Sequence, residues 1–231
     1  MKKFIGAALL VGAAMAGTTG VASAEGSLSG NVAFTSDYVW RGISQSGNDF
    51  AVQGGFDYSN GIFYAGTWAS SVDFGTSGNT ELDLYAGVKP ELGPVALDFA
   101  VLGYFYPGST DAGGDLDFYE LKGGASFSPL DPLTLSATVY YSDDFGTFDE
   151  VGLYGEVAAG FALTESFSLS AAYGNQDVEN VGSYNTYRAG ASFAAHGFGF
   201  GATYTTTDGA EGFGSESATD DKIVFSVSRA L

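Results

Sequence analysis

Along most of the chain, apolar side chains alternate with polar or small ones in consecutive short segments. Alternation with a period of two places one set of side chains on each face of a β-strand. In the segment 133–142, for example, Leu133, Leu135 and Val139 share one face, and Thr134 lies on the other. Almost no segment shows helical periodicity. The sequence therefore predicts an all-β protein.

The pattern predicts about twelve strands, an even number that would return both ends of the chain to the same side of the membrane, as in bacterial barrels. Most of them are close to the roughly 9–11 residues needed to cross a bilayer at ~45° tilt. The predicted strands are Ser27–Trp40, Asp49–Ser59, Ile62–Phe74, Glu81–Val88, Val95–Tyr106, Leu116–Phe127, Leu133–Ser142, Val151–Ala162, Phe167–Gly174, Tyr184–Ala194, Phe198–Thr206 and Lys222–Leu231.

The predicted connections alternate between tight turns and longer polar loops, as the two ends of an outer-membrane barrel do. Asn60-Gly61 is a strong hairpin signal, and four of the prolines fall in tight connections. The longer loops are predicted at 41–48, 75–80, 107–115, 143–150, 175–183 and 207–221. A soluble sandwich would have no reason to separate its loops in this way. We therefore predict a transmembrane, antiparallel, up-and-down β-barrel.

One face of the predicted strands is strongly apolar, and in lipid such a sheet must close because unpaired backbone groups are costly there. The predicted outward set includes Leu28, Phe34, Tyr38, Trp40, Phe56, Tyr64, Trp68, Val72, Phe99, Val157, Phe200 and Phe225. The aromatic residues predicted to point inward are Phe63, Tyr85, Tyr104, Tyr106, Phe118, Tyr140 and Tyr154. A soluble β-sandwich or a lipocalin-type barrel is the alternative fold.

The first 24 residues have the features of a Sec signal peptide. Lys2 and Lys3 precede an uncharged apolar run, and Ala22-Ser23-Ala24 has the form of a signal peptidase site. The alternative is a retained transmembrane helix. We expect cleavage after Ala24 and a barrel domain over residues 25–231, placed in a bacterial outer membrane among lipid and lipopolysaccharide.

Composition excludes several classes of function. The formal net charge is −19, from 8 basic and 27 acidic residues, which argues against a nucleic-acid partner. There is no cysteine and a single histidine, His196, so thiolate metal sites and sites with two histidine ligands are excluded. No Gly-x-Ser-x-Gly or phosphate-loop motif occurs. We predict no cofactor, no metal site and no catalytic activity.

Charged residues on the inward face are the candidate pore lining. The acidic members outnumber the basic ones, which would favour cations over anions in a water-filled lumen. Alternatively, the charges pair and brace the wall, for instance Lys122 with Glu120 or Glu156. The candidates are Asp57, Asp73, Asp83, Asp98, Glu120, Lys122, Glu156 and Arg188.

Arg41 lies where the first predicted strand meets the first outer loop. It is a candidate constriction residue that would fold inward to face the acids; the alternative is an interfacial arginine bound to a loop carbonyl or carboxylate. The outer loops are acidic, and the cluster from Asp111 to Asp117 has oxygen ligands that Ca²⁺ could use. A solvated acidic rim is the simpler interpretation of these loops.

The segment Phe34 to Phe74 resembles the opening of the TorF-type putative porin family. That family combines a Ser-x-Tyr-x-x-Arg-Gly-x-Ser motif, a Gln-Gly-Gly motif and a Gly-x-Tyr-x-Gly-x-Trp strand; Gly61 lies one position farther from Tyr64 than this pattern places it. The resemblance implies an outer-membrane channel and gives no substrate. The matching residues are Ser36, Tyr38, Arg41, Gly42, Ser44, Gln53, Gly54, Gly55, Gly61, Tyr64, Gly66 and Trp68.

The function predicted from these features is passive diffusion of small solutes, preferably cationic or neutral, through a narrow barrel whose pore the sequence leaves either open or occluded. The alternatives are a non-conducting structural or adhesion barrel that acts through its acidic loops, and a soluble periplasmic β domain. The sequence leaves open whether barrels associate into homo-oligomers.

Overall fold

The computed structural model describes residues 26–75, 78–109 and 116–231. The predicted signal peptide, its cleavage after Ala24, and the two aspartates Asp111 and Asp115 of the calcium alternative lie outside the described residues. The signal peptide with its cleavage site and the calcium alternative therefore stay predictions.

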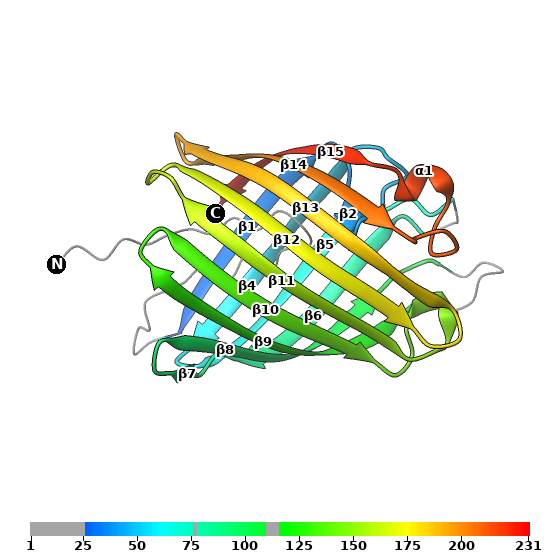
Figure 1. Cartoon of the computed structure of the whole chain (residues 1–231), viewed down its shortest axis with the longest axis horizontal. Coiled ribbons are helices and arrows are strands. Elements are labelled where there is room, and N and C mark those ends of the chain that lie inside the picture. Colours follow the sequence, from blue (N-terminus) through cyan, green and yellow to red (C-terminus); the bar gives the residue numbers. More distant parts are fainter. Residues whose placement is uncertain (1–25, 76–77, 110–115) are drawn as a thin grey trace.

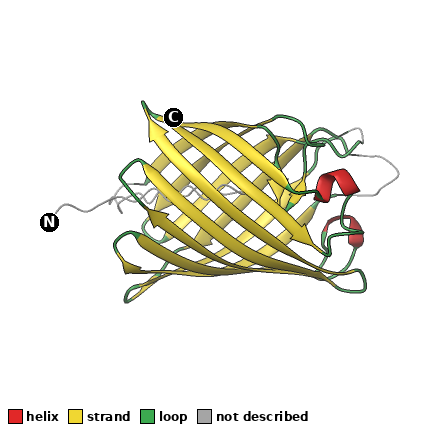
Figure 2. Cartoon of the chain, turned by 45° about the horizontal axis from the view of Figure 1, so that its top comes forward, coloured by secondary structure: helices red, strands yellow, loops and turns green. Residues whose placement is uncertain are grey.

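The described residues form a closed, twelve-stranded antiparallel barrel, which confirms the predicted fold (Figures 1 and 2). Each wall strand pairs with its neighbours along the chain; the barrel closes because β1 pairs with β15 and β6 pairs with β8. The wall strands are β1 (Ser27–Thr35), β4 (Ala51–Asn60), β5 (Phe63–Ser71), β6 (Thr80–Val88), β8 (Val95–Phe105), β9 (Phe118–Leu130), β10 (Leu133–Ser142), β11 (Gly152–Ala162), β12 (Phe167–Val178), β13 (Gly182–Ala195), β14 (Phe198–Asp208) and β15 (Lys222–Ala230).

Short elements decorate the two ends of the barrel. β7 (Glu91–Leu92) extends the turn between β6 and β8, while β2 (Val39–Trp40) and β3 (Ile43–Ser44) form a separate two-stranded hairpin. The 3₁₀ turn η1 (Gly146–Phe148) and the helix α1 (Glu216–Thr219) lie in the loops at the opposite end from β7 (Figure 1). Among the described residues, no helix is long and apolar enough to span a membrane.

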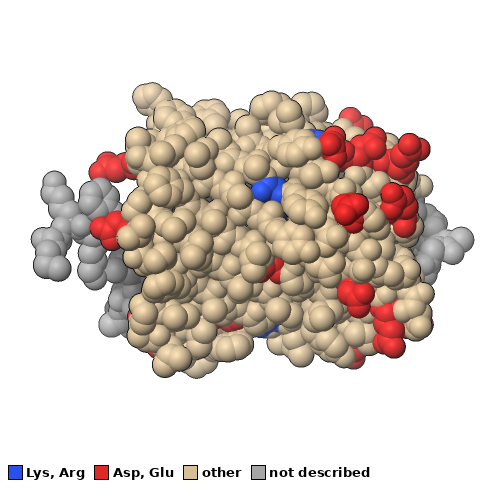
Figure 3. All heavy atoms as spheres, in the orientation of Figure 1, with Lys and Arg blue, Asp and Glu red and all other residues tan. Residues whose placement is uncertain are grey.

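The outer surface of the wall is apolar and exposed, as expected for a surface that meets lipid. Charged side chains are sparse over the middle of the barrel in Figure 3, and the acidic residues on that face gather mainly at the end where α1 lies. Exposed apolar side chains occur on every wall strand: examples are Phe34, Val52, Leu84, Phe99, Val101, Leu121, Val139, Val157, Leu169, Phe193, Phe200 and Phe225.

The two ends of the barrel differ in the length of their connections, with tight turns at one end and longer loops at the other. His196 and Gly197, both with positive φ, form the two-residue turn between β13 and β14, as two-residue hairpin turns require. The long connections lie at the other end, with one exception. Strands β12 and β13 extend to Val178 and from Gly182, so the loop predicted over 175–183 shrinks to residues 179–181. The pairing of β12 with β13 continues without a break to Val178 and Gly182, because the backbone groups of both strands stay in register up to that point.

Two predictions about which side chains face outward are wrong. The first wall strand ends at Thr35, and Tyr38 and Trp40 lie inside the barrel. In β5 the side chains predicted to face outward face inward, and those predicted to face inward face outward. Phe63 is 64% exposed, whereas Tyr64 and Trp68 pack against the interior clusters. Val72, just after β5, is buried as well.

The exchange in β5 follows from its turn. Gly61 has φ +61 and forms the turn with Ile62, so Phe63 is the first residue of the strand and takes the outward position. Since successive side chains alternate, one shifted residue reverses every later position of the strand.

Glycine at position 55 allows β4 and β5 to approach closely. A Cβ atom placed on Gly55 would lie 2.4 Å from the backbone oxygen of Thr67, and a backbone atom cannot turn aside as a flexible side chain can. We expect Gly55→Ala to lower the free energy of unfolding by about 1–3 kcal/mol, the usual cost of overpacking. The temperature at which the folded band converts on a semi-native gel measures this.

Gly160→Ala is the matched control for that substitution. Gly160 is also on a wall strand, and a Cβ there would meet nothing within 4 Å. An equal loss of stability in both variants would contradict the steric explanation.

Candidate functional site

The hairpin of β2 and β3 folds into the barrel instead of extending away from its mouth. Val39 pairs with Ser44 and Trp40 pairs with Ile43, so Arg41 and Gly42 form a two-residue turn at the tip. Both turn residues have positive φ, +48 and +84, as this class of turn requires. The tip packs against the wall at β13 and β14, where a Cβ at position 42 would lie 2.4 Å from Cγ2 of Thr207 and 3.3 Å from Cγ2 of Thr186, so glycine is favoured there.

Hydrogen bonds at the base hold the hairpin in its bent form. The hydroxyls of Ser44 and Ser46 donate to Oδ1 of Asp37 at 2.6 and 3.0 Å, and the backbone N–H of Tyr38 donates to Oγ of Ser46 at 2.9 Å. The Tyr38 hydroxyl donates to Glu81 on β6 at 2.8 Å. Tyr38 and Ser44 thus anchor the two ends of the hairpin whose tip carries Arg41.

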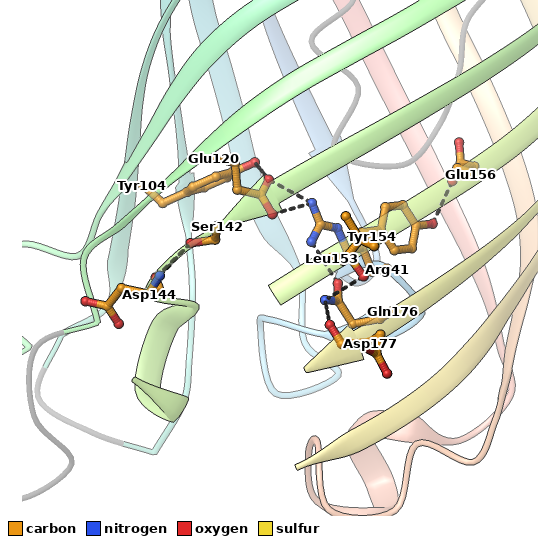
Figure 4. Close-up of polar contacts among 10 residues, drawn as sticks. All are labelled: Arg41, Tyr104, Glu120, Ser142, Asp144, Leu153, Tyr154, Glu156, Gln176 and Asp177. Atoms are coloured by element: carbon orange, nitrogen blue, oxygen red, sulfur yellow. Dashed lines mark hydrogen bonds and ion pairs between the residues drawn. The ribbon is translucent and has the colours of Figure 1, made fainter. Parts of the chain in front are cut away.

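Arg41 is the centre of a buried polar site (Figure 4). Its Nη2 lies 2.7 Å from the carboxylate of Glu120 on β9, and its Nη1 donates to Oε1 of Gln176 on β12 at 2.8 Å. The Arg41 and Glu120 side chains are only 5% and 1% exposed. The Tyr104 hydroxyl also donates to Glu120, at 3.0 Å. The arginine therefore faces acids inside the barrel, which is the inward placement considered for it from the sequence.

Aromatic rings surround this site and fill the outer part of the barrel. Trp40 stacks on Phe145, which stacks on Phe148 of η1, and Phe148 contacts Phe213 from the loop that carries α1. Phe213 in turn contacts Tyr184 of β13. Two outer loops and β13 thus pack around the hairpin, and we call the hairpin and these rings the outer plug.

Five of the predicted charged positions, Asp57, Asp98, Lys122, Glu156 and Arg188, lie below the plug in three separate contacts. Lys122 binds Asp98 at 2.8 Å, and the Tyr64 hydroxyl donates to the same carboxylate. Lys122 therefore does not pair with Glu120 or Glu156. The Tyr85 hydroxyl donates to Asp57.

The third contact is the ion pair between Nη2 of Arg188 and Oε2 of Glu156, which are 2.5 Å apart. The Tyr154 hydroxyl donates a hydrogen bond to the same carboxylate. The side chains of the Lys122 and Arg188 pairs are 16–21% exposed, far more than those of Arg41 and Glu120. Solvent therefore reaches these lower pairs more readily than the plug.

Glu81 and Asp83 form an acidic pair on β6, beside the base of the hairpin, where the Tyr38 hydroxyl binds Glu81. Both are buried, at 1% and 6% exposure, and Asp83 Oδ1 has no hydrogen-bond partner among the described residues. Asp73, by contrast, is not on the wall. β5 ends at Ser71, and the exposed Asp73 accepts a hydrogen bond from the backbone of Gly75 in the following loop.

Toward the short turns, the inward positions carry mostly small or hydroxylated side chains. Such residues leave more room in the lumen than the aromatic rings of the plug. A barrel of twelve strands lies between eight-stranded barrels, which are filled, and 16-stranded ones, which hold a channel. The small inward residues of this half include Ser29, Asn31, Ser126, Ser136, Ser170, Ser192, Ser226 and Ser228.

The sequence prediction names Arg41, Glu120 and Asp83, but it does not name Glu81 or Gln176, which lie in the same region of the structure. Glu81 is two residues from Asp83, so strand alternation alone places it on the same face and could have revealed it. Gln176 falls in the predicted loop 175–183, and no local signal shows that β12 continues through it. Within the described ranges, no group of three or more acidic or histidine side chains is arranged to hold a metal ion.

Residues 19–231 match the family described as "Bacterial protein of unknown function (Gcw_chp)". The chain belongs to the Gcw_chp family. No curated protein matches it.

Solved structures with a similar fold are outer-membrane porins. The KdgM porin has a TM-score of 0.57 at 6% identity, over 89% of this chain and 98% of the porin. The NanC porin has a TM-score of 0.58 at 10% identity, over 88% and 98%. A KdgM structure "in complex with disordered oligogalacturonate" scores 0.57 at 7% identity, over 89% and 98%. At such low identity these likenesses show the porin-type barrel fold and no more.

Proposed function

We propose that this protein is an outer-membrane channel for passive diffusion of small solutes and that it favours cations or neutral solutes. The observation that carries the proposal is the closed barrel with an apolar outer surface and a polar, charged interior. Below the plug, the side chains of Asp98 and Glu156 keep 21% and 19% exposure, as carboxylates in a water-filled lumen would. The likeness to porin folds and the resemblance to the TorF-type putative porins support the same function.

The preference for cations rests on the balance of interior charge. Four inward carboxylates, those of Asp57, Asp98, Glu120 and Glu156, face three basic side chains, those of Arg41, Lys122 and Arg188. Glu81 and Asp83 also face inward, but their burial favours the neutral carboxyl group, so they are not counted as fixed charges. An excess of fixed negative charge lowers the free energy of a cation in a narrow lumen and raises that of an anion.

Reconstitution into a planar bilayer with a salt gradient tests both parts of the proposal. We expect discrete conductance steps and a reversal potential that corresponds to cation selectivity. A reversal potential of the opposite sign would remove the electrostatic part. Folded protein without conductance would remove the channel and leave the alternative of a structural or adhesion barrel, which the filled outer half of the lumen favours.

Asp57 offers the sharpest test of selectivity, because its described partner is the neutral Tyr85 hydroxyl, with no basic side chain bound to it among the described contacts. We expect Asp57→Asn to reduce cation selectivity while the barrel stays folded, since the amide keeps an oxygen that accepts the tyrosine hydrogen bond. The reversal potential in a KCl gradient measures the change. Asp73→Asn, in an exposed loop, is the control and should leave selectivity unchanged.

The proposed location is the outer membrane, with the barrel surrounded by lipid and lipopolysaccharide after removal of residues 1–24. The exposed tyrosines near the loop end of the barrel support this location, since amphipathic rings favour membrane interfaces. They include Tyr119, Tyr141, Tyr173, Tyr187 and Tyr204. Self-association of barrels stays a prediction.

A further inference from the structure

The wall around the Arg41 guanidinium has the composition of a receptor for an organic cation. Four rings lie within 6 Å of its Cζ: Trp40 at 4.1 Å, Tyr154 at 4.3 Å, Tyr140 at 5.0 Å and Phe145 at 5.8 Å. A desolvated cation over aromatic faces is attracted by the ring quadrupoles. A carboxylate and a neutral amide complete the enclosure by accepting the guanidinium N–H groups.

Most of this enclosure belongs to the barrel wall and not to the hairpin. Glu120, Tyr140, Tyr154 and Gln176 come from the four adjacent strands β9 to β12, and Tyr140, Tyr154 and Gln176 are direct cross-strand partners. Their positions are therefore fixed by the continuous sheet, whatever the hairpin does.

Hydrogen bonds to other parts of the wall orient the same side chains. The amide nitrogen of Gln176 donates to the backbone oxygens of Leu153 and Asp177, which leaves its Oε1 directed at the cation. The Tyr154 hydroxyl donates to Glu156. The Tyr104 hydroxyl, which belongs to β8, holds Glu120. Because these side chains are held in place by the wall itself, a ligand that binds among them would lose less conformational entropy in ordering the site.

From this arrangement we infer that the wall formed by Glu120, Tyr140, Tyr154 and Gln176 is a binding site for solutes carrying a guanidinium or a similar planar cation, and that Arg41 is its tethered occupant. When the hairpin is in place, Arg41 fills the site and closes the outer end of the lumen. A solute of the same chemistry competes with Arg41 for the carboxylate and the rings. The inference deepens the proposed channel and rests on it only for the passage of such a solute, not for its binding.

The experiment is chemical rescue of Arg41→Ala by methylguanidinium. The purified barrel in detergent is titrated with millimolar methylguanidinium chloride, and the unfolding temperature is followed by the gel shift and by circular dichroism. We expect the variant to rise by several degrees in methylguanidinium, because a ligand that binds the folded state stabilises it. Sodium chloride at matched ionic strength should give little or no rise. The wild type, whose site is occupied, should respond much less.

The double variant Arg41→Ala/Glu120→Gln is the matched control, since it keeps the rings and loses the carboxylate. Its apparent affinity for methylguanidinium should be weaker by about tenfold or more, the cost of a hydrogen bond to a charged group. If Arg41→Ala does not fold, Arg41→Gln takes its place in the same titration, because the amide keeps part of the side-chain volume.

Equal responses to methylguanidinium and sodium, or no response, would overturn the inference, as would an unchanged affinity in the double variant. The outcomes also separate it from the proposed function. Binding without conductance in any variant would remove the channel and keep the site. Conductance without binding would remove the site and keep the channel.

Discussion

Arg41→Ala is expected to increase single-channel conductance several-fold and to lower the stability of the barrel more than any other substitution in the hairpin. The conductance rises because the tip of the hairpin loses the side chain that ties it to β9 and β12 across the lumen. Stability falls because Glu120, at 1% side-chain exposure, keeps its charge without a counterion. Breaking one partner of a buried ion pair costs roughly 3–5 kcal/mol.

Single-channel recording and the gel-shift temperature measure the two effects separately. Arg229→Ala is the matched control: Arg229 also packs on a ring, that of Phe198 at 4.8 Å, but it lies near the short-turn end of β15 and outside the plug. We expect it to leave conductance unchanged. A folded Arg41→Ala barrel with wild-type conductance would show that the hairpin is not the constriction.

The double variant Arg41→Ala/Glu120→Gln tests the cause of the lost stability. With the carboxylate neutralised, no uncompensated charge stays buried, so part of the loss should be recovered while conductance stays high. A double variant as unstable as Arg41→Ala alone would mean that packing against Trp40 and Tyr154, and not charge, dominates the cost.

The wall of the barrel could be predicted from the sequence because its signals are local. The strand Leu133–Ser142 has the predicted bounds, and most other strands differ by only a few residues. Alternation marks a strand, while Gly, Asn and Pro mark its turns, and none of these signals needs a distant partner. Closure follows, since lipid does not tolerate a free sheet edge.

The faces of β5 could not be predicted in the same way. Tyr64 and Trp68 alternate with Phe63 and small residues, so the pattern gives a period of two without saying which set meets lipid. Aromatic rings are as suitable for the plug as for the membrane interface. The position of the turn at Gly61 decides between the two, and a difference of one residue exchanges the faces.

The inward hairpin depends on contacts between residues far apart in the sequence. Nothing in the run Tyr38 to Trp40 distinguishes it from the strand that precedes it. Its direction is set by Asp37 with two serines and by Arg41, whose partners Glu120 and Gln176 lie 79 and 135 residues away. Local pattern could name Arg41 as a constriction candidate, but only the closed barrel brings those partners to it.

Val157→Arg should prevent or strongly weaken insertion of the barrel into lipid. Val157 is 54% exposed and lies midway along β11, where its side chain points away from the lumen. An arginine on the lipid face at the middle of the bilayer costs about 2–4 kcal/mol, because the charge loses water without gaining a partner. The fraction of protein that folds into vesicles, followed by the gel shift, measures the effect.

The next residue along the strand provides the control. Ala158 pairs with Ser136 and Ala172, points to the interior and has small neighbours, so Ala158→Arg places the same charge among polar groups at the same depth. We expect that variant to fold and to lose cation selectivity, since it adds a positive charge to an acidic lumen. Equal folding of both variants would show that the outer face does not meet lipid. A folded Val157→Arg with a misfolded Ala158→Arg would show that the two faces of β11 are exchanged.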